Sequence, residues 1–308
     1  MEVSAMAYTD LTLPQFQDQF SSEEACLQAV FDARWPRGFI CPKCGHNDGY
    51  RLSRQRVVQC CSCHRQSSIT ADTIFHRTHL PLRTWFLIIF LVAQDKGGIS
   101  AQRVADLMGM HYTTALLVLQ RIRFAMGSRD ENLKLAGYIE LDEAFFGGRG
   151  RKKVKDKDAQ TLRAKKKQIL VFVESEGKQA GNLAMVVVPN ANYDTLKPIL
   201  ERRIESEPSV SHFRTDGWQS HEVVISLGNK LTMGHIPNHL QDAEFPCLSL
   251  AITHARRFLM GTHHQFCKRN LQRYLDEFCY RWNRRHQRCQ IFSRLVTACA
   301  LSTPALAA

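Results

Sequence analysis

The sequence lacks an apolar run long enough to cross a membrane. The longest such run, residues 85–93, is about half of the roughly 20 residues that a spanning helix requires. The first residues also lack the basic end and the following apolar stretch of a secretion signal. We therefore expect a cytoplasmic protein with no membrane partner.

The sequence also lacks the even set of cysteines that suits a disulfide framework. There are eleven, and without export an odd number favours metal sites and free thiols. Two CxxC pairs, Cys41 with Cys44 and Cys60 with Cys63, are separated by fifteen residues. Four thiolates satisfy a tetrahedral structural Zn²⁺, so the spacing predicts a zinc ribbon. Cys61 is the alternative to Cys60, which we prefer because it preserves the CxxC spacing.

Acidic residues are few relative to basic ones. The chain has 29 Asp and Glu against 41 Lys and Arg, which gives a net charge of +12. This excess indicates a polyanionic partner, with an ordinary basic enzyme as the alternative. It is concentrated in residues 149–167 and 256–294, each with ten basic residues and two acids. The first segment is either a solvated hairpin or an arm in which Lys152 and Lys153 grip a DNA backbone.

The distribution of apolar and turn residues predicts a chain of several regions. β-rich runs alternate with helices after about residue 137, which is typical of an α/β domain. The expected regions are an N-terminal helical segment (1–36), the zinc ribbon (37–70), a helix-turn-helix region (71–130), the α/β domain (131–300) and a tail (301–308).

The helix-turn-helix region is predicted from its cap and turn residues. Ser100 can cap a first helix, and Gly109 can form the turn to a second. In this motif the second helix enters the major groove of DNA, where it would present Thr113, Arg121 and Arg123. A plain helical hairpin is the alternative.

Two acidic residues end short apolar runs of the α/β domain. Asp142 ends Ile-Glu-Leu-Asp, and Asp216 ends Phe-Arg-Thr-Asp. If the two strands meet at one rim of a sheet, their carboxylates offer the oxygen ligands that Mg²⁺ or Mn²⁺ prefers. Two such ions can activate a water or a 3′ hydroxyl for attack on a phosphodiester. On spacing alone, ordinary turn acids are the alternative.

Six longer blocks resolve this choice by resemblance. They are RWPRGFICPKCGH, TIFHRTHLPLRTWF, KGGISAQRVADLMG, IELDEAFFGGR, TDGW and GTHHQFCKRNLQRYLDEFCYRWNRR. Over nearly its full length the chain resembles bacterial insertion-sequence DDE transposases of the ISXO type, which carry an N-terminal zinc ribbon. The resemblance implies a ribonuclease-H-like catalytic domain, with Asp142 and Asp216 as the first and second catalytic acids.

The third catalytic position departs from the family pattern. The family usually places Asn, or an acid in related groups, on a helix shortly before the GTxH block, and this chain has His254 there. His254 is a ligand of the second metal, for which imidazole suits Mn²⁺ better than Mg²⁺, or it positions DNA or water, or it marks an inactive copy. On the same helix, Arg256 and Arg257 are candidates to grip a phosphate near the scissile bond.

The favoured hypothesis is a transposase that binds element ends, cleaves their 3′ ends and transfers the strands. It would use structural Zn²⁺ and catalytic Mg²⁺ or Mn²⁺, with double-stranded DNA as partner. Because joining two ends needs two active sites, we expect a homodimer or larger assembly on DNA. The alternative is a degenerate copy that only binds DNA, supported mainly by His254. A zinc-ribbon transcription regulator, the third hypothesis, would leave the strand-end aspartates without a task.

Overall fold

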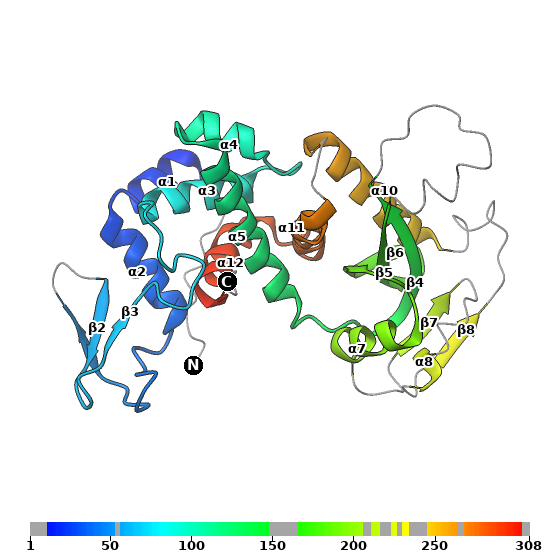
Figure 1. Ribbon diagram of the computed structural model, residues 1–308, viewed down its shortest axis with the longest axis horizontal. Helices are drawn as coiled ribbons and strands as arrows, with labels where there is room; N and C mark the ends of the chain where they lie inside the picture. Colours follow the sequence, from blue (N-terminus) through cyan, green and yellow to red (C-terminus); the bar gives the residue numbers. More distant parts are fainter. Residues whose placement is uncertain are drawn as a thin grey trace. The chain divides into compact units, whose positions relative to one another are not determined.

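The computed structural model folds into two compact units (Figure 1). The N-terminal unit comprises Met1–Arg129 together with Arg284–Ala308, and the second unit comprises Asp130–Asn283. The structure describes residues 11–52, 56–147, 166–205, 211–215, 223–226, 230–233, 245–263 and 268–303.

The helices of the N-terminal unit enclose a core of phenylalanine rings. They are α1 (Leu13–Gln19), α2 (Glu23–Arg34), α3 (Leu82–Gln94), α4 (Ala101–Met108), α5 (Tyr112–Asp130) and α12 (Ile291–Leu301). Phe16 of α1 stacks on Phe90 of α3 with ring centroids 4.7 Å apart, and Phe292 of α12 meets Phe16 edge-on at 5.7 Å. Aromatic pairs in these arrangements add to the stabilisation from buried apolar area. They hold the last helix of the chain against the first.

Helices α4 and α5 form where the sequence predicts them. The Ser100 side chain accepts the Arg103 N–H at 3.2 Å and caps α4. Gly109 ends α4 with a φ of +60°, a left-handed conformation that costs glycine little. The helix, turn and helix are therefore present.

The zinc ribbon is a small antiparallel sheet of β1 (Gly49–Arg51), β2 (Val57–Cys60) and β3 (Gln66–Ser68). It is tied to α2 by charged side chains. Arg51 pairs with Glu24, and Arg56 pairs with Glu23. From α2, the Arg34 guanidinium donates to the backbone oxygen of Ile69 at 2.7 Å. The ribbon thus rests on the helices rather than on a core of its own.

A sheet in the order β6-β5-β4-β7-β8 forms the centre of the second unit (Figure 1). Strand β4 pairs antiparallel with β5 and parallel with β7, while β6 extends the antiparallel side and β8 the parallel side. The strands are β4 (Gly137–Phe146), β5 (Lys167–Glu176), β6 (Gln179–Val188), β7 (Ser211–Thr215) and β8 (Lys230–Met233).

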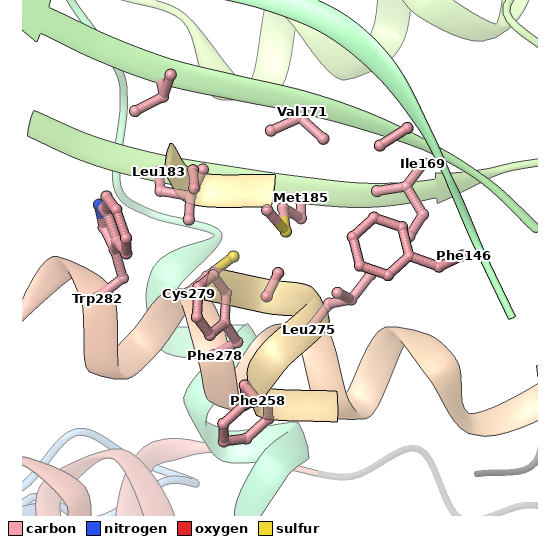
Figure 2. Close-up of a cluster of buried hydrophobic side chains, with 14 of the residues drawn as sticks. Phe146, Ile169, Val171, Leu183, Met185, Phe258, Leu275, Phe278, Cys279 and Trp282 are labelled. Carbon is pink, nitrogen blue, oxygen red and sulfur yellow. The ribbon is translucent and has the colours of Figure 1, made fainter. Parts of the chain in front are cut away.

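Helices cover both faces of this sheet. Apolar side chains of α7 (Tyr193–Arg203) and α8 (Val223–Ser226) pack on one face. Those of α10 (Pro246–Thr262) and α11 (Leu271–Asn283) pack on the other. Figure 2 shows this second core, where Leu275 and Phe278 of α11 face Val171 and Met185. The buried apolar residues of α11 recur at helical spacing, as expected for a helix that packs one face on a sheet.

The structure confirms the expected mixed α/β organisation and corrects one boundary. The α/β unit ends at Asn283, whereas the expected region extended from 131 to 300, and the following residues join the N-terminal unit. The physical reason is the apolar face of α12, which packs on α2 and α3. No helix in the described parts of the chain combines the length and apolarity needed to cross a bilayer.

Candidate functional site

The four cysteines predicted as zinc ligands lie together in the ribbon. Their Sγ atoms all lie within 4.8 Å of one another, with Cys41 and Cys63 3.6 Å apart and Cys44 and Cys60 also 3.6 Å apart. A tetrahedral ion with Zn–S bonds of about 2.3 Å separates its sulfurs by about 3.8 Å. The donor set therefore fits a structural Zn²⁺. Cys61 is exposed and lies outside the cluster, as its spacing predicts.

The two CxxC knuckles share one backbone design. In each, the residue four places after the first cysteine donates its N–H to that cysteine's carbonyl: Gly45 to Cys41 at 2.9 Å, and His64 to Cys60 at 3.2 Å. Both donors are left-handed, with φ of +72° at Gly45 and +53° at His64. Glycine adopts this left-handed conformation with little strain. The first knuckle has glycine at this position, whereas the second knuckle has His64.

Strand β4 presents its two groups of side chains to opposite faces of the sheet. Ile139 and Leu141 belong to the core under α7, whereas Ala144 and Phe146 belong to the core under α10. Because side chains alternate along a strand, Asp142 points to the α10 face. It is half-buried, and its Oδ1 accepts the Glu143 N–H at 2.7 Å. The first predicted catalytic acid thus lies on a well-paired strand beneath a helix.

Glu143, which follows Asp142, points the other way. It lies opposite Leu170 of the α7 face, and its Oε2 accepts a hydrogen bond from the Gln168 side chain at 2.7 Å. The two adjacent carboxylates are therefore separated by the sheet.

A third carboxylate of β4 shares the face of Asp142. Glu140 is fully buried, and its Oε2 accepts the backbone N–H of Leu248, in the first turn of α10, at 2.7 Å. Burial raises the pKa of the Glu140 carboxyl, while the Leu248 N–H and the Arg214 guanidinium oppose the shift. The only sign of Glu140 in the sequence is an acid inside an apolar run, which does not by itself indicate a helix cap.

The second predicted catalytic acid, Asp216, lies outside the described residues. The strand that leads to it is described. In the parallel pairing of β7 with β4, Phe213 lies opposite Ile139 and Arg214 opposite Glu140. Phe213 is fully buried in the α7 core. By alternation, Arg214 lies on the same face as Glu140.

The third predicted position, His254, lies exposed on α10. Its ring meets that of Trp282 edge-on, with centroids 5.9 Å apart, and the Trp282 indole N–H donates to the carbonyl of Gly181 at 2.9 Å. Arg256 is also exposed, and its guanidinium lies 5.7 Å from the centre of the Phe146 ring. Residues two apart on a helix do not face the same way. His254 therefore lies on the α11 flank of α10, and Arg256 on the β4 flank.

The predicted DNA contacts differ in their exposure. Thr113 is exposed at the start of α5, and Arg257 is exposed on α10. Arg123 is only 2% exposed, and its guanidinium donates to the carbonyl of Ile99 at 3.5 Å. This burial corrects the prediction that Arg123 reads DNA, since its guanidinium is turned into the N-terminal unit.

Arg121 is likewise held by backbone oxygens. Its Nη1 donates to the carbonyls of Ile74 at 3.0 Å and His76 at 3.3 Å. Both arginines therefore brace the loops before and after α3 and are left out of the DNA surface proposed below. Lys152 and Lys153 lie outside the described residues.

The fold and the site define a two-part chain, a zinc ribbon with helices and an α/β unit with an acid beneath a helix. That acid, Asp142, was expected at the end of a strand, but β4 continues to Phe146 because its pairing with β5 extends that far. Comparisons with known proteins agree with both parts. The ISXO2-like transposase domain model matches residues 134–283, and the transposase zinc-ribbon domain model matches residues 21–66. The chain therefore carries an ISXO2-like transposase domain preceded by a transposase zinc-ribbon domain. Its α/β unit is consistent with the ribonuclease-H-like core expected for that transposase domain.

Individual relatives are more distant. A Halobacterium salinarum protein described as an uncharacterized protein in transposable element ISH50 is 27% identical over 139 residues, which cover 44% of this chain and 46% of that protein. The chain thus matches about half the length of this relative. A simian T-cell lymphotropic virus intasome in complex with the PP2A regulatory subunit B56 gamma gives a TM-score of 0.29 at 14% identity, covering 62% of this chain and 66% of its own. That similarity is too low to add to the argument.

Proposed function

We propose that the chain is an active transposase that cleaves the 3′ ends of an insertion element and joins them to target DNA. Asp142 and Asp216 are its proposed metal ligands. The observation that supports this is the parallel pairing of β4 and β7, in which Glu140 lies opposite Arg214. Each aspartate follows one of these residues by two positions. The proposal includes the continuation of this register to residue 216, which would bring both carboxylates to one face.

Mg²⁺ or Mn²⁺ held by these carboxylates would supply the Lewis acidity needed to activate an oxygen nucleophile and to stabilise the leaving oxygen. The chain's own part is to fix the ligands. Asp142 is paired with Val171 of β5, the pairing of β4 with β7 ends two residues before it at Glu140, and its bond to the Glu143 N–H restricts rotation of the carboxylate. Water is the nucleophile for cleavage and the freed 3′ hydroxyl for joining, so no covalent protein–DNA intermediate is needed.

The proposed DNA surface uses exposed cations and polar groups. The 17 residues of α10 contain no Asp or Glu, and Arg256 and Arg257 are exposed on it. Such a helix favours phosphate oxygens. Thr113 is exposed on the second helix of the proposed helix-turn-helix motif. The basic segment 149–167, with Lys152 and Lys153, is the proposed arm of a homodimer or larger assembly on double-stranded DNA.

His254 is proposed to take the place of the family's third catalytic residue. Its contact with Trp282 fixes the ring on the α11 flank of α10. A His254→Asn variant tests the role directly, because Asn restores the usual residue. Loss of activity assigns His254 a function that Asn cannot perform, whereas a gain of activity identifies the histidine as a lesion.

Nicking of a supercoiled plasmid that carries the DNA flanking the gene tests the main proposal. We expect nicks with Mg²⁺ or Mn²⁺, and their loss in Asp142→Asn and in Asp216→Asn. Asp194→Asn, at an exposed position in the first turn of α7, is the matched control and should nick like the wild type. Binding of the plasmid without nicking in either metal would instead support the degenerate copy that only binds DNA.

A further inference from the structure

Helix α10 begins without a side-chain cap of its own. Phe245 is its N-cap residue and makes no capping hydrogen bond, and Pro246 follows at the first helical position. The first N–H groups of a helix have no partner within the helix and need an acceptor from elsewhere. Glu140 supplies one, because its Oε2 accepts the Leu248 N–H at 2.7 Å. The cap of α10 therefore comes from β4, 108 residues earlier in the chain.

The hydrogen bond between Glu140 of β4 and Leu248 of α10 is buried. Glu140 is 0% exposed, and the donor residue Leu248 and its neighbour Cys247 are also buried. A carboxylate at a helix N-terminus is favoured by the helix dipole, and more so where water is excluded. Replacement of the bond by water would need an opening between α10 and the sheet. The contact is therefore a fixed point between the helix and the strand.

A second and weaker contact joins α10 to the end of β4. The guanidinium of Arg256 lies over the ring of Phe146, which is 4% exposed at the end of β4. Glu140, Asp142 and Phe146 occupy alternate positions on one face of β4. Asp142 thus lies between the two residues of β4 that contact α10, Glu140 and Phe146.

We propose that Glu140 is a positioning residue that sets the height of α10 along β4, and so the distance between Asp142 and the α10 residues above it. The inference rests on the proposed function for its catalytic meaning, although the docking of the helix is independent of it. Glu140 touches neither DNA nor metal in this role. It acts through Leu248, by holding the helix that carries His254 and Arg256.

The charge of Glu140 has a separate neighbour. Arg214 lies opposite it on β7, and its guanidinium favours the ionised carboxyl. Two effects of Glu140 can therefore be separated by substitution. Glu140→Gln keeps an acceptor oxygen at the same reach and removes the charge. Glu140→Asp keeps the charge and withdraws the acceptor by one methylene group.

Hydrogen exchange of the zinc-loaded full chain tests the docking without any DNA. In Glu140→Asp we expect the first-turn amides of α10 to exchange roughly tenfold faster, which is the effect of one lost hydrogen bond. Glu140→Gln should keep most of the protection. Glu174→Ala is the matched control, because Glu174 accepts the Ala136 and Asn182 N–H groups on the other face of the sheet. It should leave α10 unchanged.

Unchanged exchange in Glu140→Asp, or equal acceleration by Glu174→Ala, would overturn the assignment. Faster exchange in Glu140→Gln together with protection in Glu140→Asp would also overturn it, because exchange would then depend on the charge of residue 140 and not on the length of its side chain. The exchange result stands whether or not the wild type cuts DNA. A wild type that fails to nick therefore refutes the proposed function alone.

Plasmid nicking tests the catalytic consequence. Glu140→Asp should lower the nicking rate at saturating DNA by about 10²-fold, since a displacement on the order of 1 Å costs this much. The affinity for an element-end duplex, measured by fluorescence anisotropy, should stay near that of the wild type. Glu140→Gln should recover most of the rate. Equal losses of rate in both variants, or a loss of DNA affinity that accounts for the rate, would refute a positioning role.

Discussion

Glu23 Oε1 accepts the backbone N–H of Leu82 at 2.8 Å, and so a residue of α2 caps the N-terminus of α3. Its Oε2 accepts the next N–H, that of Arg83, at 3.1 Å. The N-cap residue of α3 is Pro81, which has no side-chain acceptor. Since Glu23 also pairs with Arg56 of the ribbon, one carboxylate joins two helices and the zinc module.

Replacement of Glu23 should lower the free energy of unfolding more than replacement of its neighbour Glu24. We expect Glu23→Ala to lower the free energy of unfolding of the N-terminal unit by about 1–2 kcal/mol, the range for loss of a capping acceptor. Glu24→Ala, the matched control, removes an ion pair whose carboxylate is 71% exposed, and should cost less than about 0.5 kcal/mol. Urea unfolding of the zinc-loaded protein measures both. Equal losses would contradict the capping role.

The zinc cluster predicts different behaviour of two adjacent cysteines. Cys60→Ser should abolish stoichiometric zinc binding and unfold the ribbon, because zinc supplies the folding free energy of such modules. Cys61→Ser should keep one zinc per chain, since Cys61 is exposed outside the cluster. Elemental analysis of the purified variants gives the zinc content. Loss of zinc from Cys61→Ser with retention in Cys60→Ser would reverse the ligand assignment.

The left-handed histidine of the second knuckle is a site for stabilisation. His64→Gly should relieve a backbone cost of about 1 kcal/mol or more, because glycine adopts this φ with little strain. Gly45→Ala at the matching place in the first knuckle should act in the opposite direction. A chelator titration should shift to higher chelator for His64→Gly and to lower chelator for Gly45→Ala. A His64→Gly ribbon that loses zinc more readily would show that the imidazole itself contributes.

Local patterns in the sequence were sufficient for much of the fold. The helix predicted to follow Ser100 and to end at the Gly109 turn is α4, because cap and turn residues are local signals. The zinc ligands follow from CxxC spacing in the same way. Asp142, the proposed first catalytic acid, was singled out by the family resemblance and by its position after an apolar run, and it lies on β4 under α10.

Features that depend on distant partners were not predictable. Helix α12 joins the N-terminal unit because Phe292 packs with Phe16, and no local pattern specifies that partner. The role of Glu140 depends on Leu248, which only the folded sheet brings near. In the sequence, Arg121 and Arg123 look like residues that contact DNA. In the structure, their guanidinium groups donate hydrogen bonds to backbone carbonyl oxygens within the fold. Charge alone does not distinguish these two uses of arginine.

Asp276 of α11 should make the stability of the second unit depend on pH. It is 8% exposed, and burial raises its pKa from 3.8 to about 6, against the opposing effects of Gln272 and Arg273. A carboxyl whose pKa is higher in the folded state than in the unfolded state favours folding most when the pH is below the unfolded-state pKa. That contribution to stability is lost as the pH rises through the folded-state pKa of about 6. The shift corresponds to roughly 3 kcal/mol between pH 4 and pH 7.

Asp276→Asn removes this ionisation and keeps an oxygen to accept the Gln272 side chain, whose bond to Asp276 is 2.8 Å long. We expect the variant to unfold at higher urea than the wild type at pH 7.5, with the difference shrinking toward pH 5. Asp194→Asn, at an exposed position of the same unit, should show no such trend. Taking the difference between variants at each pH cancels the loss of zinc at low pH. A constant difference between Asp276→Asn and the wild type from pH 5 to 7.5 would mean that Asp276 does not titrate there and keeps its charge through its neighbours.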